Sequence, residues 1–110
     1  MNLISRDELA KKLESTVRPV LVEALPKKYY SDGHLHGAIR INIDEVNARA
    51  PSLITDKRAE IVVYCAGPTC ANSDRVAQQL DAIGYENVRI FKGGKSDWVE
   101  AGGPIERSLS

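Results

Sequence analysis

The run from Ile61 to Tyr64 is the feature that most constrains how this chain can fold. Its four residues are apolar and mostly β-branched, which favours a short strand. A strand without polar alternation is buried on both faces, as in the centre of a parallel sheet. Cys65 ends the run, a loop with no charged residue follows, and a helical pattern begins near Asn72. The segment therefore predicts a strand–loop–helix unit of an α/β domain.

Helix and strand patterns alternate along the rest of the chain. Ser5 and Glu8 form a capping box that predicts a helix over residues 6–15, and Ile4 with Leu9 forms the matching hydrophobic staple. Further strands are expected at 20–24, 40–43 and 88–91. Further helices are expected from Asp44 to Ala50 (ended by Pro51), from Asn72 or Ser73 to Gly84, and from after Gly93-Gly94, through Trp98, to near Gly102. Residues 26–33 are expected to form a polar loop, and the tail up to Ser110 is expected to fray. Short strands between helices predict one α/β domain over residues 1–110, with a largely parallel sheet.

Composition argues against several classes of partner. Fifteen basic and fifteen acidic residues give a formal net charge of zero, so neither nucleic acid nor an anionic membrane is expected to bind. The apolar runs are too short to span a membrane, and the first residues show no signal-peptide pattern. Two cysteines five positions apart do not form the framework of a secreted disulfide protein. We therefore expect a cytoplasmic protein.

Cys65 is the expected nucleophile. In open α/β sheets the functional site lies beyond the carboxyl ends of the strands, which is where this thiol would sit. Loop N–H groups and a helix N-terminus would face the sulfur and lower its pKa. The alternative is a buried core residue, because cysteine is among the most buried residue types. The substrate-binding loop is expected to offer the amides of Ala66, Gly67, Thr69, Cys70 and Ala71, with help from the Thr69 hydroxyl, whereas Pro68 has no N–H. Gly67 suits such a loop because glycine tolerates unusual dihedral angles.

Three segments in order along the chain resemble single-domain rhodaneses, a family of sulfurtransferases. They are residues 30–38 (YSDGHLHGA), Tyr64-Cys65 with the loop and helix after it, and Phe91-Lys92-Gly93-Gly94 with Trp98. The resemblance implies a rhodanese-like fold, with a five-stranded, mostly parallel sheet flanked by helices on both faces. It also implies an enzyme in which Cys65 takes sulfane sulfur from a small donor such as thiosulfate, becomes a persulfide, and passes the sulfur to a thiol, to cyanide or to a sulfur-carrier protein. No cofactor and no metal are implied, because the sulfur is carried by the protein.

Two departures from the family pattern concern the loop. The helical pattern after Cys65 begins about two residues later than in the common six-residue loop, and enlarged loops occur in related phosphatases and arsenate reductases that hold an oxyanion. No arginine or lysine lies between Ala66 and Ser73. Phosphate esters are usually held by an arginine fork, so this absence argues against a phosphatase. Lys92 and Lys95 are candidates for a weak outer positive field.

Cys70 leaves several alternatives open. It is a candidate resolving thiol that would form a disulfide with Cys65, or a small apolar filler where the loop meets the helix. A zinc site would need His34 and His36 as the other two ligands. Two functions other than sulfur transfer also stay open. One is a thiol redox protein or an arsenate-type oxyanion reductase that uses both cysteines, and the other is a non-catalytic interaction module with the rhodanese fold.

The remaining marked residues have expected structural roles. His34 is expected to bond a backbone carbonyl in the loop before Ala38, with general-base catalysis as the alternative. Glu23 is expected to hold a loop by hydrogen bonds, and Trp98 is expected to pack in the core. Tyr29 and Tyr30 either rim the site or pack on the loop.

Overall fold

The computed structural model describes residues 2–107 and contains a five-stranded parallel sheet with strand order β1-β6-β5-β2-β4. A separate antiparallel pair joins β3 and β7. The strands are β1 (Asn2–Leu3), β2 (Val20–Glu23), β3 (His34–Leu35), β4 (Ile39–Arg40), β5 (Ile61–Tyr64), β6 (Val88–Phe91) and β7 (Ile105–Glu106). The helices are α1 (Arg6–Glu14), α2 (Lys27–Asp32), α3 (Val46–Leu53), α4 (Asn72–Ala82) and α5 (Gly94–Glu100), with a 3-10 turn, η1, at Ile43–Glu45. The predicted α/β architecture is confirmed.

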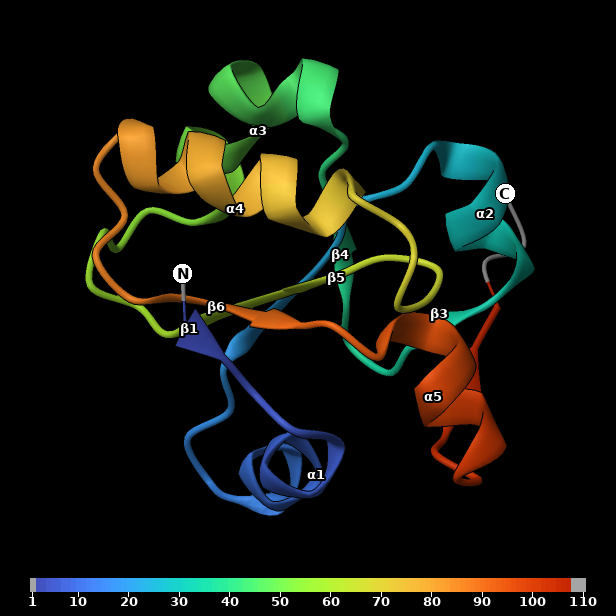
Figure 1. Ribbon diagram of the computed structural model, residues 1–110. Helices are drawn as coiled ribbons and strands as arrows, with labels where there is room; N and C mark the ends of the chain where they lie inside the picture. Colours follow the sequence, from blue (N-terminus) through green and yellow to red (C-terminus); the bar gives the residue numbers. More distant parts are fainter. Residues whose placement is uncertain (1, 108–110) are drawn as a thin grey trace.

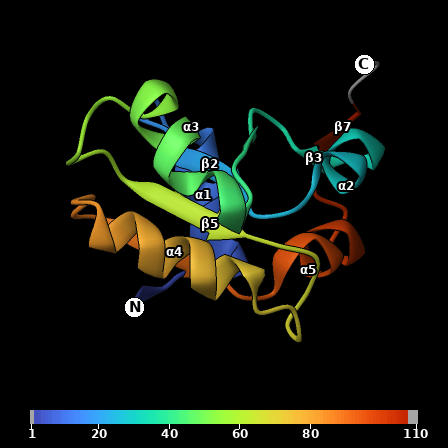
Figure 2. The same cartoon turned by 90° about the horizontal axis from the view of Figure 1, so that it is seen from above.

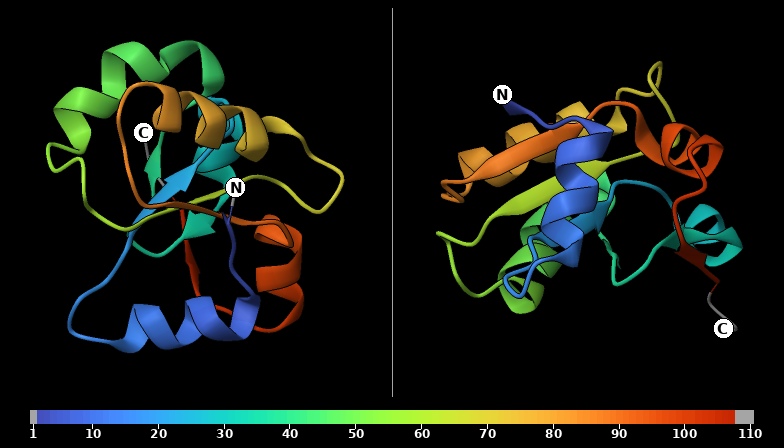
Figure 3. Two further views of the ribbon diagram at one scale, coloured as in Figure 1. Left: turned by 60° about the vertical axis from the view of Figure 1, so that its left-hand side comes forward. Right: turned by 90° about the horizontal axis from the view of Figure 1, so that it is seen from below.

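Helices cover both faces of the sheet. Helices α3 and α4 lie on one face, and α1 and α5 lie on the other (Figure 1). Viewed from above, α4 runs along β5 beside α3, and α2 sits at the end of the molecule near α5 (Figure 2). The side and lower views place α1 beneath the strands, on the face opposite α4 (Figure 3).

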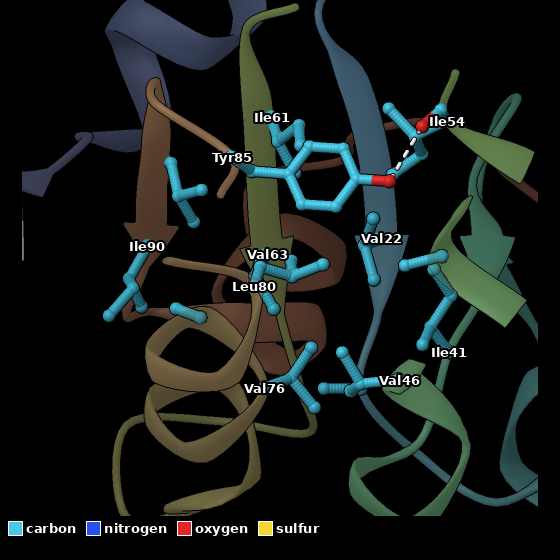
Figure 4. Packing of buried hydrophobic residues seen from close by; sticks show 14 of the residues in the cluster. Val22, Ile41, Val46, Ile54, Ile61, Val63, Val76, Leu80, Tyr85 and Ile90 are labelled. Carbon is cyan, nitrogen blue, oxygen red and sulfur yellow. Dashed lines mark hydrogen bonds between the residues drawn. The ribbon is translucent and has the colours of Figure 1, made fainter. Parts of the chain in front are cut away.

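Strand β5 separates two hydrophobic clusters. Ile61 and Val63 point toward α4, whereas Val62 and Tyr64 belong to the cluster under α1 and Trp98. All four β5 side chains are fully buried, as a central strand of a parallel sheet requires. On the α4 side, Val22, Val76, Leu80 and Ile90 are among the residues that close around Val63 (Figure 4). Successive side chains of a strand point to opposite faces of the sheet, so Cys65 lies on the same face as Ile61 and Val63, toward α4.

Several predicted boundaries were wrong. Residues 26–33 are not a loop, because Lys27–Asp32 form α2. The expected strand at 40–43 is only Ile39–Arg40, and Ile43 belongs to η1. Asn42, rather than Asp44, is the N-cap residue of that turn: the Glu45 amide donates to the Asn42 backbone carbonyl at 2.9 Å, and the Asn42 amide donates to the Glu45 carboxylate at 3.3 Å.

Proline does not end α3, which continues through Pro51 to Leu53. Pro51 lies close to the end of the helix, so it removes a single hydrogen bond there. At α1 the predicted cap is half formed. Ser5 accepts from the Glu8 amide, but the Glu8 carboxylate turns to Arg89 in the neighbouring strand β6.

Three short strands were not predicted, namely β1, β3 and β7. Each has two residues, too few for a period of two to be recognised. β1 supplies the fifth strand of the sheet through its pairing with β6. The tail expected to fray includes β7 at Ile105–Glu106, and residues 108–110 lie outside the described part of the chain. Within residues 2–107, no helix has both the length and the apolar character needed to cross a bilayer.

Candidate active site

The loop after Cys65 leaves the carboxyl end of β5 and turns into α4 (Figure 1). The beginning of α5 packs directly against it. The Lys95 amide donates to the Cys65 carbonyl at 2.8 Å, and the Ser96 amide donates to the Ala66 carbonyl at 2.9 Å. The start of the loop is therefore held by backbone hydrogen bonds from a helix that comes thirty residues later in the sequence.

Two glycines make this close approach possible. Gly94 has a φ of +68°, and a Cβ there would lie 2.7 Å from the Cys65 carbonyl oxygen and 2.8 Å from the Gly67 nitrogen. Gly67 has no positive φ, so the prediction that it adopts an unusual dihedral angle was wrong. Packing, rather than backbone conformation, favours glycine at position 67, because a Cβ there would lie 2.8 Å from Ser96 Oγ. The second glycine of the Gly-Gly segment thus shapes the loop that carries the thiols.

Cys65 lies where the sequence predicts, but its environment differs from the prediction. The residue is only 1% exposed and belongs to the core cluster on the α4 face. Its thiol donates toward the Cys70 carbonyl at 3.3 Å and toward Ser73 Oγ at 3.4 Å. Burial, followed by a hydrogen bond to the Cys70 side chain, raises the pKa of Cys65 even though the Ser73 side chain and amide oppose the shift. The expected low pKa of Cys65 is contradicted, because the loss of hydration outweighs the backbone dipoles.

Cys70 is the thiol with the lowered pKa. It is partly exposed and packs against the same core cluster. Partial burial raises its pKa, but the hydrogen bond from Cys65, the peptide groups of Asn72 and Ala66, and the charge of Lys92 together outweigh burial, so the net shift is downward. The two cysteines are both free. They therefore form an unequal pair, because the pKa of Cys65 is raised and that of Cys70 is lowered.

The N-terminus of α4 supplies amides to both sulfurs. The N-cap residue is Ala71, which has no side-chain hydrogen bond to the helix, so the predicted caps Asn72 and Ser73 were wrong. The first-turn N–H groups of a helix have no partner within the helix. Here the Asn72 peptide stabilises the Cys70 thiolate and the Ser73 peptide favours the Cys65 thiolate. The first-turn peptide groups of α4 therefore lower the pKa of both thiols.

The other loop residues divide between the site and the loop's own structure. Ala66 contributes its peptide group at Cys70, whereas the Cys70 amide is used inside the loop, where it donates to the Gly67 carbonyl at 3.1 Å. Thr69 and Ala71 are exposed, as are Ala66 and Pro68. The loop therefore presents a small, uncharged and accessible rim around Cys70.

The two candidate lysines have different roles. Lys92, just after β6, pairs with Asp74 of α4 at 2.6 Å and donates toward the Cys70 carbonyl at 3.4 Å. Hydrogen bonding to Asp74 raises the pKa of Lys92, so this side chain stays charged beside the loop. Lys95 is engaged elsewhere, with Glu23 at 3.1 Å and the Tyr29 carbonyl at 2.9 Å. Lys92 is thus the side chain that supplies positive charge at the thiols.

Glu23 joins neighbouring elements by hydrogen bonds, but its carboxylate contacts Tyr64 of β5 and Lys95 of α5 rather than the predicted loop. It is fully buried and accepts from the Tyr64 hydroxyl at 2.8 Å. That hydroxyl in turn accepts from the Leu35 amide at 3.1 Å. Burial, and then the charge of Glu23, raise the pKa of Tyr64, which keeps the donor protonated. With Lys95, this chain links β2, β5, β3 and α5 beside the site.

His34 has the structural role expected of it. Its Nδ1 lies 2.9 Å from the Tyr30 carbonyl oxygen, and its ring stacks on the Tyr30 ring at 3.8 Å. The Tyr30 hydroxyl donates to the Ala38 carbonyl at 2.6 Å, so Tyr30 packs on the loop. Tyr29 instead is half exposed and borders a groove with Ala66. Trp98 is buried edge-to-face against Phe91, as predicted.

Sequence reasoning missed three residues at or near the site. Ser73 accepts the Cys65 thiol, Asp74 fixes Lys92, and Glu106 receives the Gly37 amide at 2.9 Å while pairing with both histidines. Ser73 and Asp74 lay within the predicted helix start, where an inward hydroxyl could have been noted. In residues 2–107, no group of three or more histidine, cysteine and acidic side chains is arranged to hold a metal ion.

Residues 5–101 match the family described as Rhodanese-like domain. The chain belongs to this family. The resemblance noted on three separate segments is therefore confirmed across nearly the whole sequence. An HTH-type transcriptional regulator from Mycobacterium tuberculosis is 33% identical over 103 residues, which cover 94% of this chain and 44% of the regulator. The chain thus spans less than half the length of that curated relative.

Solved rhodanese-like structures share the fold. The rhodanese-like domain of an Anabaena sp. protein is 28% identical, with a TM-score of 0.86 over 99% of this chain and 81% of that chain. A thiosulfate sulfurtransferase from Pseudomonas aeruginosa is 20% identical, with a TM-score of 0.88 over 99% of this chain and 20% of that chain. The second likeness shows the fold alone.

Proposed function

We propose that this rhodanese-like domain is a sulfurtransferase. A cysteine of the loop at residues 65–71 takes sulfane sulfur from a small donor such as thiosulfate and holds it as a persulfide. The outer sulfur then passes to a nucleophilic acceptor such as cyanide, a low-molecular-weight thiol or a sulfur-carrier protein. The observation that carries the proposal is a pair of thiols, one of them with a lowered pKa, at the N-terminus of α4 in a rhodanese fold.

The surroundings suit an anionic sulfur species. A persulfide is negatively charged and keeps that charge through the transfer, so oriented peptide N–H groups stabilise it before and after each step. The peptide groups of Ala66, Asn72 and Ser73 serve this purpose, and Lys92 adds a positive charge. Dianionic phosphate esters would require a denser set of positive donors than this loop has. The donor and acceptor we propose are therefore small sulfur compounds.

One assay tests the function without regard to which cysteine reacts. One sample receives thiosulfate alone, and its intact mass and released sulfide are measured. A second sample receives thiosulfate and cyanide together, and thiocyanate is measured. We expect the protein to take sulfur from thiosulfate, seen as an adduct with the mass of one sulfur atom or as released sulfide, and we expect thiocyanate to form. A double variant, Cys65→Ser with Cys70→Ser, is the matched control and should give none of these products. If the wild-type protein gives no more adduct, sulfide or thiocyanate than this control, the sulfurtransferase proposal fails.

A second candidate function is thiol redox chemistry, which the contact between the two cysteine side chains favours. A dithiol pair of this kind reduces a disulfide or an oxyanion such as arsenate and becomes a disulfide itself. Turnover with an external dithiol reductant and arsenate, lost in either single cysteine variant and accompanied by no sulfur adduct, would favour this function. No adduct and no turnover under either condition would favour an interaction module.

A further inference from the structure

We propose that Cys70 is the thiol that attacks the sulfur donor, and that Cys65 is the buried resolving thiol that releases the bound sulfur as hydrosulfide. This assignment rests on the proposed sulfurtransferase function and gives its two sulfur atoms separate roles. It reverses the order that the position of Cys65 at the end of β5 suggests. Three observations carry it, namely accessibility, the direction of the thiol hydrogen bonds and the placement of charge.

Accessibility separates the two thiols. Cys65 is 1% exposed and packs among side chains of the α4-facing core, including Val63 and Val76. Cys70 is partly exposed, and Pro68 and Thr69 immediately before it are exposed. A donor must approach the attacking sulfur in line with the bond that breaks. With the loop as it stands, that approach is open at Cys70 and closed at Cys65.

The hydrogen bonds assign the proton to Cys65. Its sulfur lies 3.3 Å from the Cys70 carbonyl oxygen, which is an acceptor, and 3.4 Å from Ser73 Oγ. A carbonyl oxygen can only receive a hydrogen bond, so this contact favours the protonated thiol. The two cysteine side chains also act on each other, which raises the pKa of Cys65 and lowers that of Cys70. This interaction agrees with the proton position that the contact to the carbonyl indicates.

The charges near the pair favour an anion at Cys70. Lys92 acts on Cys70 and contacts its carbonyl oxygen from the end of β6. Asp74 on α4 pairs with Lys92 and partly offsets this charge. From α5, Lys95 is directed away to Glu23. The groups that face Cys70 are therefore the Cys65 thiol, the Lys92–Asp74 pair and the amides of the loop and helix.

The first step transfers one sulfur atom to Cys70. The Cys70 thiolate forms a bond to the sulfane sulfur of thiosulfate, the S–S bond of thiosulfate breaks, and sulfite leaves with the bonding electron pair. Cys70 then carries a persulfide whose outer sulfur is negatively charged. Neither a proton nor an external electron is needed, because the charge on the thiolate passes to the persulfide.

The second step uses Cys65. Its sulfur attacks the inner sulfur of the Cys70 persulfide, forming a Cys65–Cys70 disulfide. The bond between inner and outer sulfur breaks, and the outer sulfur leaves as hydrosulfide with the proton of the Cys65 thiol. The two cysteines lose two electrons to the departing sulfur. An external dithiol reductant must then reduce the disulfide before the next cycle. Without this reductant, each chain releases one hydrosulfide at most.

The experiment compares the full chain with two variants, Cys65→Ala and Cys70→Ser, after each has been shown to unfold cooperatively. Each protein receives thiosulfate without any reductant. Intact mass, fragment-ion mapping of the peptide that holds both cysteines, and released sulfide are measured. We expect Cys65→Ala to hold a stable extra sulfur on Cys70 and to release no sulfide. Cys70→Ser should hold none, and the wild-type protein should release about one sulfide per chain and finish as the disulfide.

The outcomes distinguish failure of this cysteine assignment from failure of the proposed sulfurtransferase function. An adduct that survives in Cys70→Ser and is absent from Cys65→Ala would overturn the assignment and leave the sulfurtransferase intact. A stable adduct on wild-type Cys70 with no sulfide and no disulfide would overturn the resolving role of Cys65. No adduct on any of the proteins would defeat the sulfurtransferase function itself. If Cys65→Ala unfolds, Cys65→Ser provides the second test, because serine fills nearly the same volume.

Discussion

Replacing Gly94 by alanine tests whether the close packing of α5 on the loop holds the site together. The new Cβ would lie 2.7 Å from the Cys65 carbonyl oxygen, 2.8 Å from the Gly67 nitrogen and 2.9 Å from its Cα. These are backbone atoms, so no side chain can turn aside to make room. The φ of +68° adds a conformational cost for any residue with a Cβ.

The two costs can be separated in magnitude. A left-handed backbone costs a non-glycine residue about 1–2 kcal/mol. Overpacking against fixed atoms costs about 1–3 kcal/mol more. Gly94→Ala should therefore lower the free energy of unfolding by roughly 2–5 kcal/mol, less the small gain that alanine brings by restricting the unfolded chain. Relief of the clash would also stretch the bonds from the Lys95 and Ser96 amides to the loop.

Gly102 provides a matched control. Its φ is +80°, and a Cβ there would meet no atom within 4 Å, so Gly102→Ala carries the conformational cost without the clash. The difference between the two variants isolates the packing term, about 1–3 kcal/mol. Urea unfolding measures it, and at a slope of about 1–3 kcal/mol per molar it corresponds to a midpoint difference of roughly 1 M. Equal stability of the two variants would refute the packing argument.

Two further predictions concern the core and an exposed ion pair. Tyr85→Phe removes the buried hydrogen bond of 2.6 Å from the Tyr85 hydroxyl to the Ile54 carbonyl (Figure 4). The variant should lower the free energy of unfolding by about 1–3 kcal/mol, measured by urea unfolding. The exposed Tyr29→Phe is the control, and a loss at Tyr85 no larger than at Tyr29 would contradict this reasoning. The hydrogen bond from the Gly37 amide, and then the contact with His36, lower the pKa of Glu106 in the folded protein. The ionised carboxylate therefore stabilises the fold at any pH above the ordinary carboxyl pKa, and this stabilisation is lost as the pH falls through the lowered pKa. Glu106→Gln should therefore lose less stability than the wild type in urea melts run from pH 7 into the acid range below about pH 4. A steeper acid loss in the variant would show that the sign is wrong.

The elements that could be predicted from sequence are those with a clear local period. The run from Ile61 to Tyr64 has no polar member and became the central strand, and the pattern of Val76, Ala77 and Leu80 became the buried face of α4. In each case, residues close in sequence carry enough information to specify the local structure.

The failures fall where contacts with residues outside the segment decide. β1 is only two residues long and exists because its edge pairs with β6. Lys27–Asp32 was expected to be a loop, yet its helix is stabilised by contacts of Tyr30 with His34 and Ala38. The hydrophobic period of β1 does not identify β6 as its partner, and the period of residues 27–32 does not identify His34 and Ala38 as the partners of Tyr30.

The amino-acid sequence alone determined the α/β class, the position of a thiol at the end of the central strand, and the presence of a second thiol in the same loop. The tertiary structure decided which of the two sulfurs is accessible and which has the lowered pKa. A pKa depends on burial and on the direction of nearby donors, and both are set by how α4, α5 and Lys92 close around the loop. Sequence spacing places Cys65 and Cys70 in one loop, but only packing buries one thiol and leaves the other partly exposed.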